Sequence, residues 1–278
     1  MRRIWPLLVC LLATSGCGGY YILTVPDHLA PAGDETAVVV RLQRNDFFIL
    51  AMPVKGAVMR FQVGGDQQRA AYTDDLGYAG ATLQAPDESG RYLMRVSHLD
   101  REGEEVYAEV LVYAWRANRP VIAVDLDGLP RAAGGKLWDA RDALKRLNRG
   151  ANLIYFTRKD VKDHDKAHRM LAAAGFPDGP VLLWRRKRWH IVRGRWKMPK
   201  VVVESRLVSQ LAEIRGLFPA LNKGVCNSEI AAKAFAAAGL KPVVIGKANV
   251  NLPEVTRFSS WSLLAKQGLC DSASQPAQ

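Results

Sequence analysis

The chain has 278 residues, of which 49% are hydrophobic and 24% are charged. This composition is typical of a folded globular protein and excludes a disordered or low-complexity chain, and the length leaves room for two domains. The 39 lysines and arginines exceed the 27 acidic residues, giving a net charge of +12. Charge therefore favours anionic partners: phosphate esters, acidic lipids or nucleic acid.

The first 17 residues have the pattern of an export signal: two arginines, an apolar run at 4–13, and small residues up to Cys17. The run is too short to span a bilayer as a permanent helix. The segment resembles a bacterial lipoprotein signal peptide, which implies lipidation of Cys17 and anchoring to the periplasmic or extracellular face of a membrane. Because Thr14 replaces the aliphatic residue usual at that position, ordinary signal-peptide cleavage stays open.

Two of the four cysteines, Cys10 and Cys17, belong to this signal. Cys226 and Cys270 remain in a compartment where disulfides persist. Pairing depends on the distance and direction between their Cα atoms, so a disulfide and two buried thiols both stay open. No Cys/His spacing of the metal-binding type occurs.

Residues 20–118 are predicted to form an all-β unit, because short runs of strand formers alternate with turn sequences. The runs are 38–42, 57–63, 92–96 and 106–113. Their regular spacing is typical of a β-sandwich. Residues 73–83 and 90–96 resemble the immunoglobulin-like modules of bacterial surface proteins, which implies a spacer or docking domain without chemistry.

Residues 121–124, Val-Ile-Ala-Val, predict a strand that is buried on both faces. The strand leads into Asp125, Leu126, Asp127 and Gly128. Ligands of open α/β sheets bind at the carboxyl ends of strands, and paired carboxylates suit a hard cation such as Mg²⁺. Asp-x-Asp-Gly is also a common turn sequence, and the preceding buried strand is the context that favours a site.

From residue 119 to residue 270, helical and strand patterns alternate, which predicts an α/β domain with a mainly parallel sheet and right-handed crossovers. The further predicted strands are 152–157, 180–184 and 242–246, and the predicted helices are 138–147, 164–174, 203–217 and 228–238. Residues 271–278 are polar and are predicted to form a disordered tail.

Four sequences in this order resemble the haloacid-dehalogenase (HAD) superfamily and, within it, the lipin-type phosphatidate phosphatase domain. They are Asp125-Leu-Asp-Gly, Tyr155-Phe-Thr-Arg, Gly175-Phe-Pro-Asp-Gly-Pro-Val-Leu-Leu and Ile214-Arg-Gly-Leu-Phe-Pro. The resemblance covers residues 121–247. It implies a three-layer Rossmannoid domain that hydrolyses a phosphomonoester with the help of Mg²⁺.

The resemblance also implies a role for each matching residue. Asp125 would be the nucleophile that forms an aspartyl-phosphate, and Asp127 the general acid and base, with both acids on the Mg²⁺ ion. Thr157 would hydrogen-bond the transferring phosphoryl group. Gly128 and Arg158 are the expected substrate contacts.

The chain departs from the family pattern in two places. The lysine that neutralises the phosphoryl oxygens belongs to a stretch in which Lys197 and Lys200 are both candidates. The last metal-binding aspartate of the family aligns with Ala231, so the nearby Asn227 and Glu229 are the candidate metal ligands.

Cations alternate with tryptophans in the stretch 185–197. It is typical of a β-hairpin that turns at residues 193–194 with solvated cations, and it also suits a surface for anionic headgroups or nucleic acid. Export argues against nucleic acid and favours acidic lipid.

The sequence therefore predicts an exported, Mg²⁺-dependent phosphatase of the HAD type that acts on a phosphomonoester, with a lipid phosphate such as phosphatidate as one candidate. The alternative is a catalytically degenerate protein of the same fold that binds anionic ligands or lipids at the membrane surface, because a fold does not imply a function.

Overall fold

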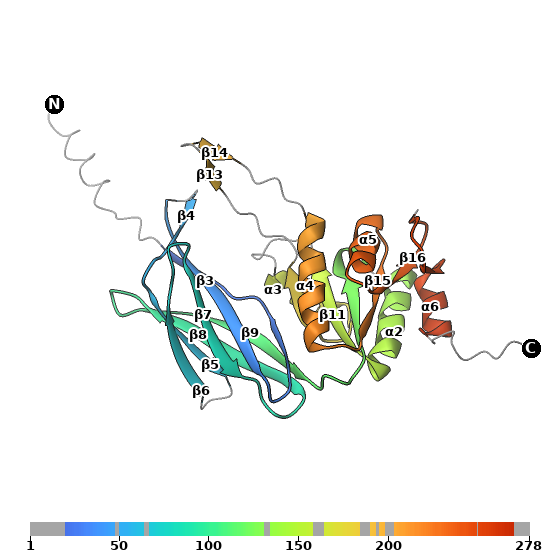
Figure 1. Cartoon of the computed structure of the whole chain (residues 1–278), viewed down its shortest axis with the longest axis horizontal. Helices are drawn as coiled ribbons and strands as arrows, with labels where there is room; N and C mark the ends of the chain where they lie inside the picture. The colour runs from blue at the N-terminus through green and yellow to red at the C-terminus, as the bar shows by residue number, and fades with distance from the viewer. Residues whose placement is uncertain are drawn as a thin grey trace, which may run out of the picture. The chain divides into compact units, whose positions relative to one another are not determined.

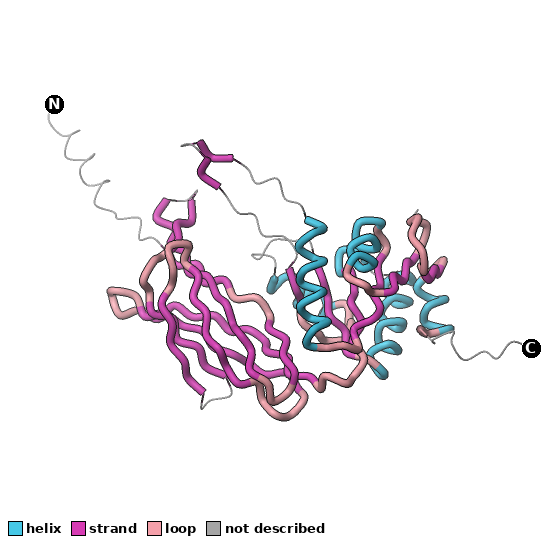
Figure 2. Tube along the Cα trace, in the orientation of Figure 1, coloured by secondary structure: helices cyan, strands magenta, loops and turns pink. Residues whose placement is uncertain are grey.

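A computed structural model describes residues 20–269 except 48–49, 64–66, 131–133, 158–163, 184–189, 193–194, 198–202 and 249. The chain divides into two compact units. Of the described residues, those in 20–25, 37–83 and 93–110 form the β unit, and those in 26–36, 84–92 and 111–269 form the α/β unit. All helices of the described residues belong to the α/β unit (Figures 1 and 2). The fold is therefore mixed, with several β-sheets, one of which is parallel and packed against helices.

The strands that precede residue 116 form two sheets. One has the order β1-β3-β4 with β7 also paired to β3, and the other has the order β2-β9-β8-β5-β6. The bounds are β1 (Tyr20–Thr24), β2 (His28–Pro31), β3 (Glu35–Phe47), β4 (Leu50–Pro53), β5 (Val58–Val63), β6 (Gln67–Tyr72), β7 (Tyr78–Gln84), β8 (Gly90–Leu99) and β9 (Glu105–Trp115).

Strand β5 shows how the sequence forms these sheets. Its buried residues Met59, Phe61 and Val63 alternate with exposed ones, which gives the strand one core face and one solvent face. The four runs predicted from their strand-forming residues fall within or overlap strands β3, β5, β8 and β9, so the strand predictions are confirmed.

The α/β unit is built on a six-stranded sheet of order β12-β11-β10-β15-β16-β17, in which every neighbouring pair is parallel. The bounds are β10 (Val121–Asp125), β11 (Asn152–Thr157), β12 (Val181–Leu183), β15 (Leu221–Cys226), β16 (Lys241–Ile245) and β17 (Thr256–Phe258). From β10 the chain adds β11 and β12 on one side of the sheet, and it then adds β15, β16 and β17 on the other side. The carboxyl ends of β10 and β15 therefore mark the topological switch point, the place where such sheets bind ligands.

Helices cover both faces of this sheet (Figure 1). Ile122 and Val124 of β10 pack into the core under α2, α3 and α6, whereas Val121 and Ala123 pack into the core under α4 and α5. Alternate strand residues thus feed opposite cores. The bounds are α2 (Gly135–Gly150), α3 (His164–Ala173), α4 (Val203–Leu217), α5 (Glu229–Ala237) and α6 (Trp261–Gln267).

The four predicted helices and the predicted parallel sheet are confirmed. The sequence did not predict β15, β17 or α6. Strand β15 has the sequence Leu-Asn-Lys-Gly-Val-Cys. Asparagine, lysine and glycine have low β propensity, so the segment does not show the pattern of a strand. Gly224 has a packing reason: a Cβ there would lie 2.3 Å from the Phe235 ring of α5.

The predicted hairpin is present in the backbone as β13 (His190–Val192) paired antiparallel with β14 (Arg195–Lys197). The signal at 1–17 with Cys17, the tail at 271–278 and Cys270 lie outside the described residues. Within the described part of the chain, no helix combines the length and the apolar character that a membrane span needs.

Candidate functional site

Asp125 ends β10, in which every residue is buried. The chain then forms the short 3₁₀ turn η1 (Leu126–Gly128), and Asp125 caps this turn because its Oδ1 accepts the backbone N–H of Asp127 at 3.2 Å. Only 3% of Asp125 is exposed. The first acid is thus held in a fixed orientation at the carboxyl edge of the sheet.

Ser228 supplies a second contact to this carboxylate from the other side of the switch point. Its Oγ donates to Asp125 Oδ2 at 3.2 Å and accepts the backbone N–H of Ala231 at 3.3 Å, which makes it the N-cap of α5. A hydroxyl can do both, because it has one donor and two lone pairs. The sequence predicts Ser228 only as the first residue of a helix. Because β15 was not predicted, no local signal placed this serine at the edge of the sheet.

The second acid is held by the neighbouring strand. Thr157, the last residue of β11, is fully buried, and its Oγ1 donates to Asp127 Oδ1 at 2.9 Å. The structure therefore brings together the three residues predicted as the chemical core: Asp125, Asp127 and Thr157. The Thr157 hydroxyl, which was predicted to contact a phosphoryl group, donates its hydrogen bond to Asp127 and so positions that acid.

Gly128 and Asn227 contact each other. Asn227 Nδ2 donates to the Gly128 carbonyl oxygen at 2.9 Å, and a Cβ on Gly128 would lie only 2.6 Å from Asn227 Oδ1. The backbone of Gly128 is not in the left-handed region, so close approach of Asn227 is what requires a glycine. Gly128, the predicted substrate contact, and Asn227, a predicted metal ligand, thus join η1 to the loop after β15.

Glu229, the other predicted metal ligand, makes an ion pair on its own helix. Its Oε1 lies 2.8 Å from Lys233 Nζ, and the two side chains are 51% and 58% exposed. Ala231, where the resemblance places the family's last acid, is 1% exposed and offers no ligand atom from its side chain. Metal roles for Glu229 and Asn227 stay predictions.

The described residues do not make up the metal shell that the resemblance implies. Asp125 and Asp127 carry the hard oxygen donors that Mg²⁺ prefers. Yet within the described ranges no group of three or more His, Cys, Asp or Glu side chains could hold a metal ion, and the third acid is missing at Ala231.

Cys226, which ends β15 beside this site, is not a candidate nucleophile. Burial, together with the nearby charge of Asp125, raises the pKa of its thiol to about 12. A thiol with so high a pKa is protonated at neutral pH, and the thiolate is the reactive form. Its pairing with Cys270 stays a prediction.

The predicted cationic residues are not placed at the site. Arg158 and Lys200 lie outside the described residues, and Lys197 is described only as part of the backbone of β14. Their proposed contacts with a phosphoryl group stay predictions.

No family model and no curated protein matches the chain. Among solved structures, it is similar to a carbohydrate acetylesterase from Xanthomonas citri, with 11% identity over 88% of this chain and 73% of that chain and a TM-score of 0.35. A xyloglucanase from Bacteroides ovatus matches with 10% identity over 86% and 71%, and a TM-score of 0.24. A 2,6-sialyltransferase from Photobacterium sp. JT-ISH-224 matches with 13% identity over 79% and 41%, and a TM-score of 0.23. Similarities this weak carry no argument about activity, so the function has to be argued from the site.

Proposed function

We propose that the α/β unit is a phosphatase domain of the HAD type, in which Asp125 attacks a phosphomonoester and forms an aspartyl-phosphate. The observation that carries this proposal is a buried, oriented carboxylate at the switch point of a doubly wound parallel sheet, with a second carboxylate held beside it. The strand order and the Asp125-Leu-Asp-Gly sequence support the family assignment.

The first step uses the fixed orientation of Asp125. Its two oxygens accept hydrogen bonds from the Asp127 N–H and from the Ser228 hydroxyl, which limits rotation of the carboxylate before it reacts. One oxygen attacks phosphorus, the bond from phosphorus to the leaving oxygen breaks, and protonated Asp127 gives its proton to that oxygen. The products are the free alcohol and aspartyl-phosphate.

In the second step, the ionised Asp127 takes a proton from water while the water oxygen attacks phosphorus. The bond between phosphorus and the Asp125 oxygen breaks, which releases inorganic phosphate and restores both acids. Because Oδ1 of Asp127 accepts a hydrogen bond from Thr157, the transferred proton is carried on Oδ2.

The remaining parts of the proposal rest on sequence. Dependence on Mg²⁺ and a lysine at 197 or 200 come from the resemblance, and export with a lipid anchor at Cys17 comes from the signal pattern. The two sheets of the strand-rich region are proposed as an immunoglobulin-like sandwich that serves as a docking module. A phosphate ester on a lipid is the substrate candidate for a membrane-anchored chain.

A second candidate is favoured by Ala231, which is buried and apolar where an acid is expected, and by the pairing of Glu229 with Lys233. In this candidate the same edge of the sheet binds an anionic group without turnover. The binding protein would keep the fold and the contacts of Asp125 and would lack phosphate release.

Release of phosphate from an aryl phosphate, with and without Mg²⁺, separates the two candidates. We expect the full chain to release phosphate, Asp125→Asn to lose that activity down to the background rate, and Glu213→Gln, which removes an exposed carboxylate of α4, to retain it. Mass spectrometry should find a phosphoryl adduct on the peptide that contains Asp125. Equal background rates in all three proteins, with inorganic phosphate still bound by calorimetry, would establish the binding protein instead.

A further inference from the structure

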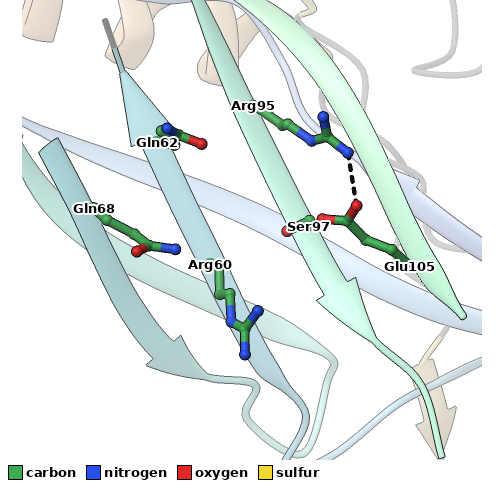
Figure 3. Close-up of a pocket in the computed structure, with 6 residues that line it drawn as sticks. All are labelled: Arg60, Gln62, Gln68, Arg95, Ser97 and Glu105. Carbon is green, nitrogen blue, oxygen red and sulfur yellow. Dashed lines mark hydrogen bonds and ion pairs between the residues drawn. The ribbon is translucent and has the colours of Figure 1, made fainter. Parts of the chain in front are cut away.

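A polar cavity lies on the solvent face of the sheet formed by β9, β8, β5 and β6 (Figure 3). Its volume of about 280 Å³ approaches the lower end of the range of about 300–1,000 Å³ typical of small-molecule sites. It is lined by Arg60 and Gln62 of β5, Gln68 of β6, Arg95 and Ser97 of β8, and Glu105 of β9.

Strand register places these side chains next to one another. Arg60 is opposite Ser97, and Gln62 is opposite both Arg95 and Gln68. Because successive strand residues point to opposite faces, the core residues between them lie on the other side of the sheet. Four strands thus contribute to one patch in which every lining side chain is polar.

One guanidinium in this cavity is already fixed. Arg95 donates to Glu105 at 2.7 Å and stacks over the Tyr107 ring at 4.3 Å. Arg60, by contrast, has no hydrogen bond or ion pair with any other residue in the described part of the chain. Its planar group of five donors is suited to a carboxylate, which it can bind through two parallel hydrogen bonds.

The other lining groups identify the rest of the ligand. Two amides, the Ser97 hydroxyl and the Glu105 carboxylate present donors and acceptors side by side, and sugar hydroxyls also both donate and accept. Glu105 is already paired with Arg95, which leaves the Arg60 guanidinium as the lining group for one carboxylate. A sugar with a single carboxylate on its ring satisfies both conditions.

An exposed aromatic ring extends the patch along β6. Tyr72 is 74% exposed and lies four residues beyond Gln68, on the same face of the strand. That spacing corresponds to roughly 13 Å, which is beyond the reach of one sugar ring in the cavity. Exposed aromatic rings provide apolar contact area with a polar tip, so Tyr72 is positioned to stack on a neighbouring sugar.

We propose that this cavity binds one carboxylated sugar of an acidic polysaccharide, with its carboxylate on Arg60 and its hydroxyls on Gln62, Gln68 and Glu105, and that Tyr72 stacks on an adjacent sugar. This site belongs to the β unit and is independent of the chemistry at Asp125.

The test measures binding of oligogalacturonate to the full chain by calorimetry, with the methyl-esterified oligosaccharide as the uncharged analogue. We expect the charged form to bind and the ester to bind much more weakly. Arg60→Gln should weaken binding about tenfold or more, because it removes a charge-assisted hydrogen bond. Tyr72→Ala should weaken binding several-fold while the thermal unfolding curve stays unchanged.

Arg69→Gln is the matched control, because it removes the same charge from the neighbouring position of β6, on the other face of the strand. It should change affinity by less than about twofold, because exposed charges that make no direct contact act weakly. Equal losses for Arg60→Gln and Arg69→Gln would overturn the proposal, since the attraction would then be non-specific. Absence of binding, or equally tight binding of a poly-glutamate peptide, would also overturn it.

Discussion

Replacing Ser228 with alanine tests the contact that orients the candidate nucleophile. The change removes two hydrogen bonds at once: the cap on the Ala231 N–H at 3.3 Å and the bond to Asp125 Oδ2 at 3.2 Å. Ser260 offers a control, because it caps α6 through the Leu263 N–H at the same 3.3 Å, and its second hydrogen bond is to the neutral Ser262 hydroxyl at 2.9 Å.

The two substitutions differ in the second bond that is lost, which is to a charged carboxylate for Ser228 and to a neutral hydroxyl for Ser260. Loss of an N-cap costs about 1 kcal/mol, loss of a hydrogen bond to a charged group about 1.5–3 kcal/mol, and loss of a neutral one about 0.5–1.5 kcal/mol. Ser228→Ala should therefore cost about 2.5–4 kcal/mol and Ser260→Ala about 1.5–2.5 kcal/mol. The upper end applies because Asp125 is only 3% exposed, and water cannot readily replace the lost donor.

The assay is urea unfolding followed by tryptophan fluorescence. All tryptophans other than Trp5 belong to residues 111–278, so the signal reports the α/β unit separately from the β unit, as a chain with two units requires. Ser228→Thr, which retains the hydroxyl, should recover most of the lost free energy of unfolding. If Ser228→Ala costs no more than Ser260→Ala, the bond to Asp125 contributes nothing and the argument for an oriented carboxylate fails.

Three further predictions concern the α/β unit. Gly224→Ala should destabilise it by about 1–3 kcal/mol through overpacking, because the new Cβ would meet the Phe235 ring at 2.3 Å; an unchanged urea midpoint would refute this. Asp27→Ala should cost at least about 1–3 kcal/mol, since Asp27 is 3% exposed and accepts the backbone N–H of Val181 at 2.8 Å; a thermal melt with no decrease in Tm would count against it. The pKa of the Cys226 thiol is raised from 9.0 to about 12, so the folded state holds a proton that the unfolded state loses. The thiol's contribution is present in full below pH 9, and stability should fall by about 1.4 kcal/mol per pH unit between pH 9 and pH 12. Cys226→Ala should show a smaller slope than the wild type over that range, and identical slopes would contradict the prediction.

Local sequence was sufficient to place the candidate acids. The apolar run at 121–124 predicts a doubly buried strand, and the structure buries every residue of β10. Asp125 and Asp127 follow that strand directly, so their position at its carboxyl end depends only on neighbouring residues. The same holds for the helices of the α/β unit, because helical periodicity within a single segment determines which residues face the core.

Strand β15 could not be predicted in this way. Asn222 and Lys223 weaken its hydrophobic pattern and Gly224 lowers its β propensity. The strand is stabilised by pairing on both sides, with β10 and β16, and by the close packing of Phe235 on Gly224. Those interactions exist only in the assembled sheet. The local sequence pattern therefore does not predict β15, although this strand forms one side of the switch point.

The sequence by itself thus determined that Asp125 and Asp127 follow a buried strand. It also determined that the domain is α/β with a parallel sheet. Only the tertiary structure decided what each of these residues contacts. Ser228 reaches Asp125 across 103 positions of the chain, and Asn227 reaches Gly128 across 99. Periodicity encodes the direction in which a side chain points, whereas the identity of its partner depends on which strands become neighbours, and that is decided when the sheet assembles.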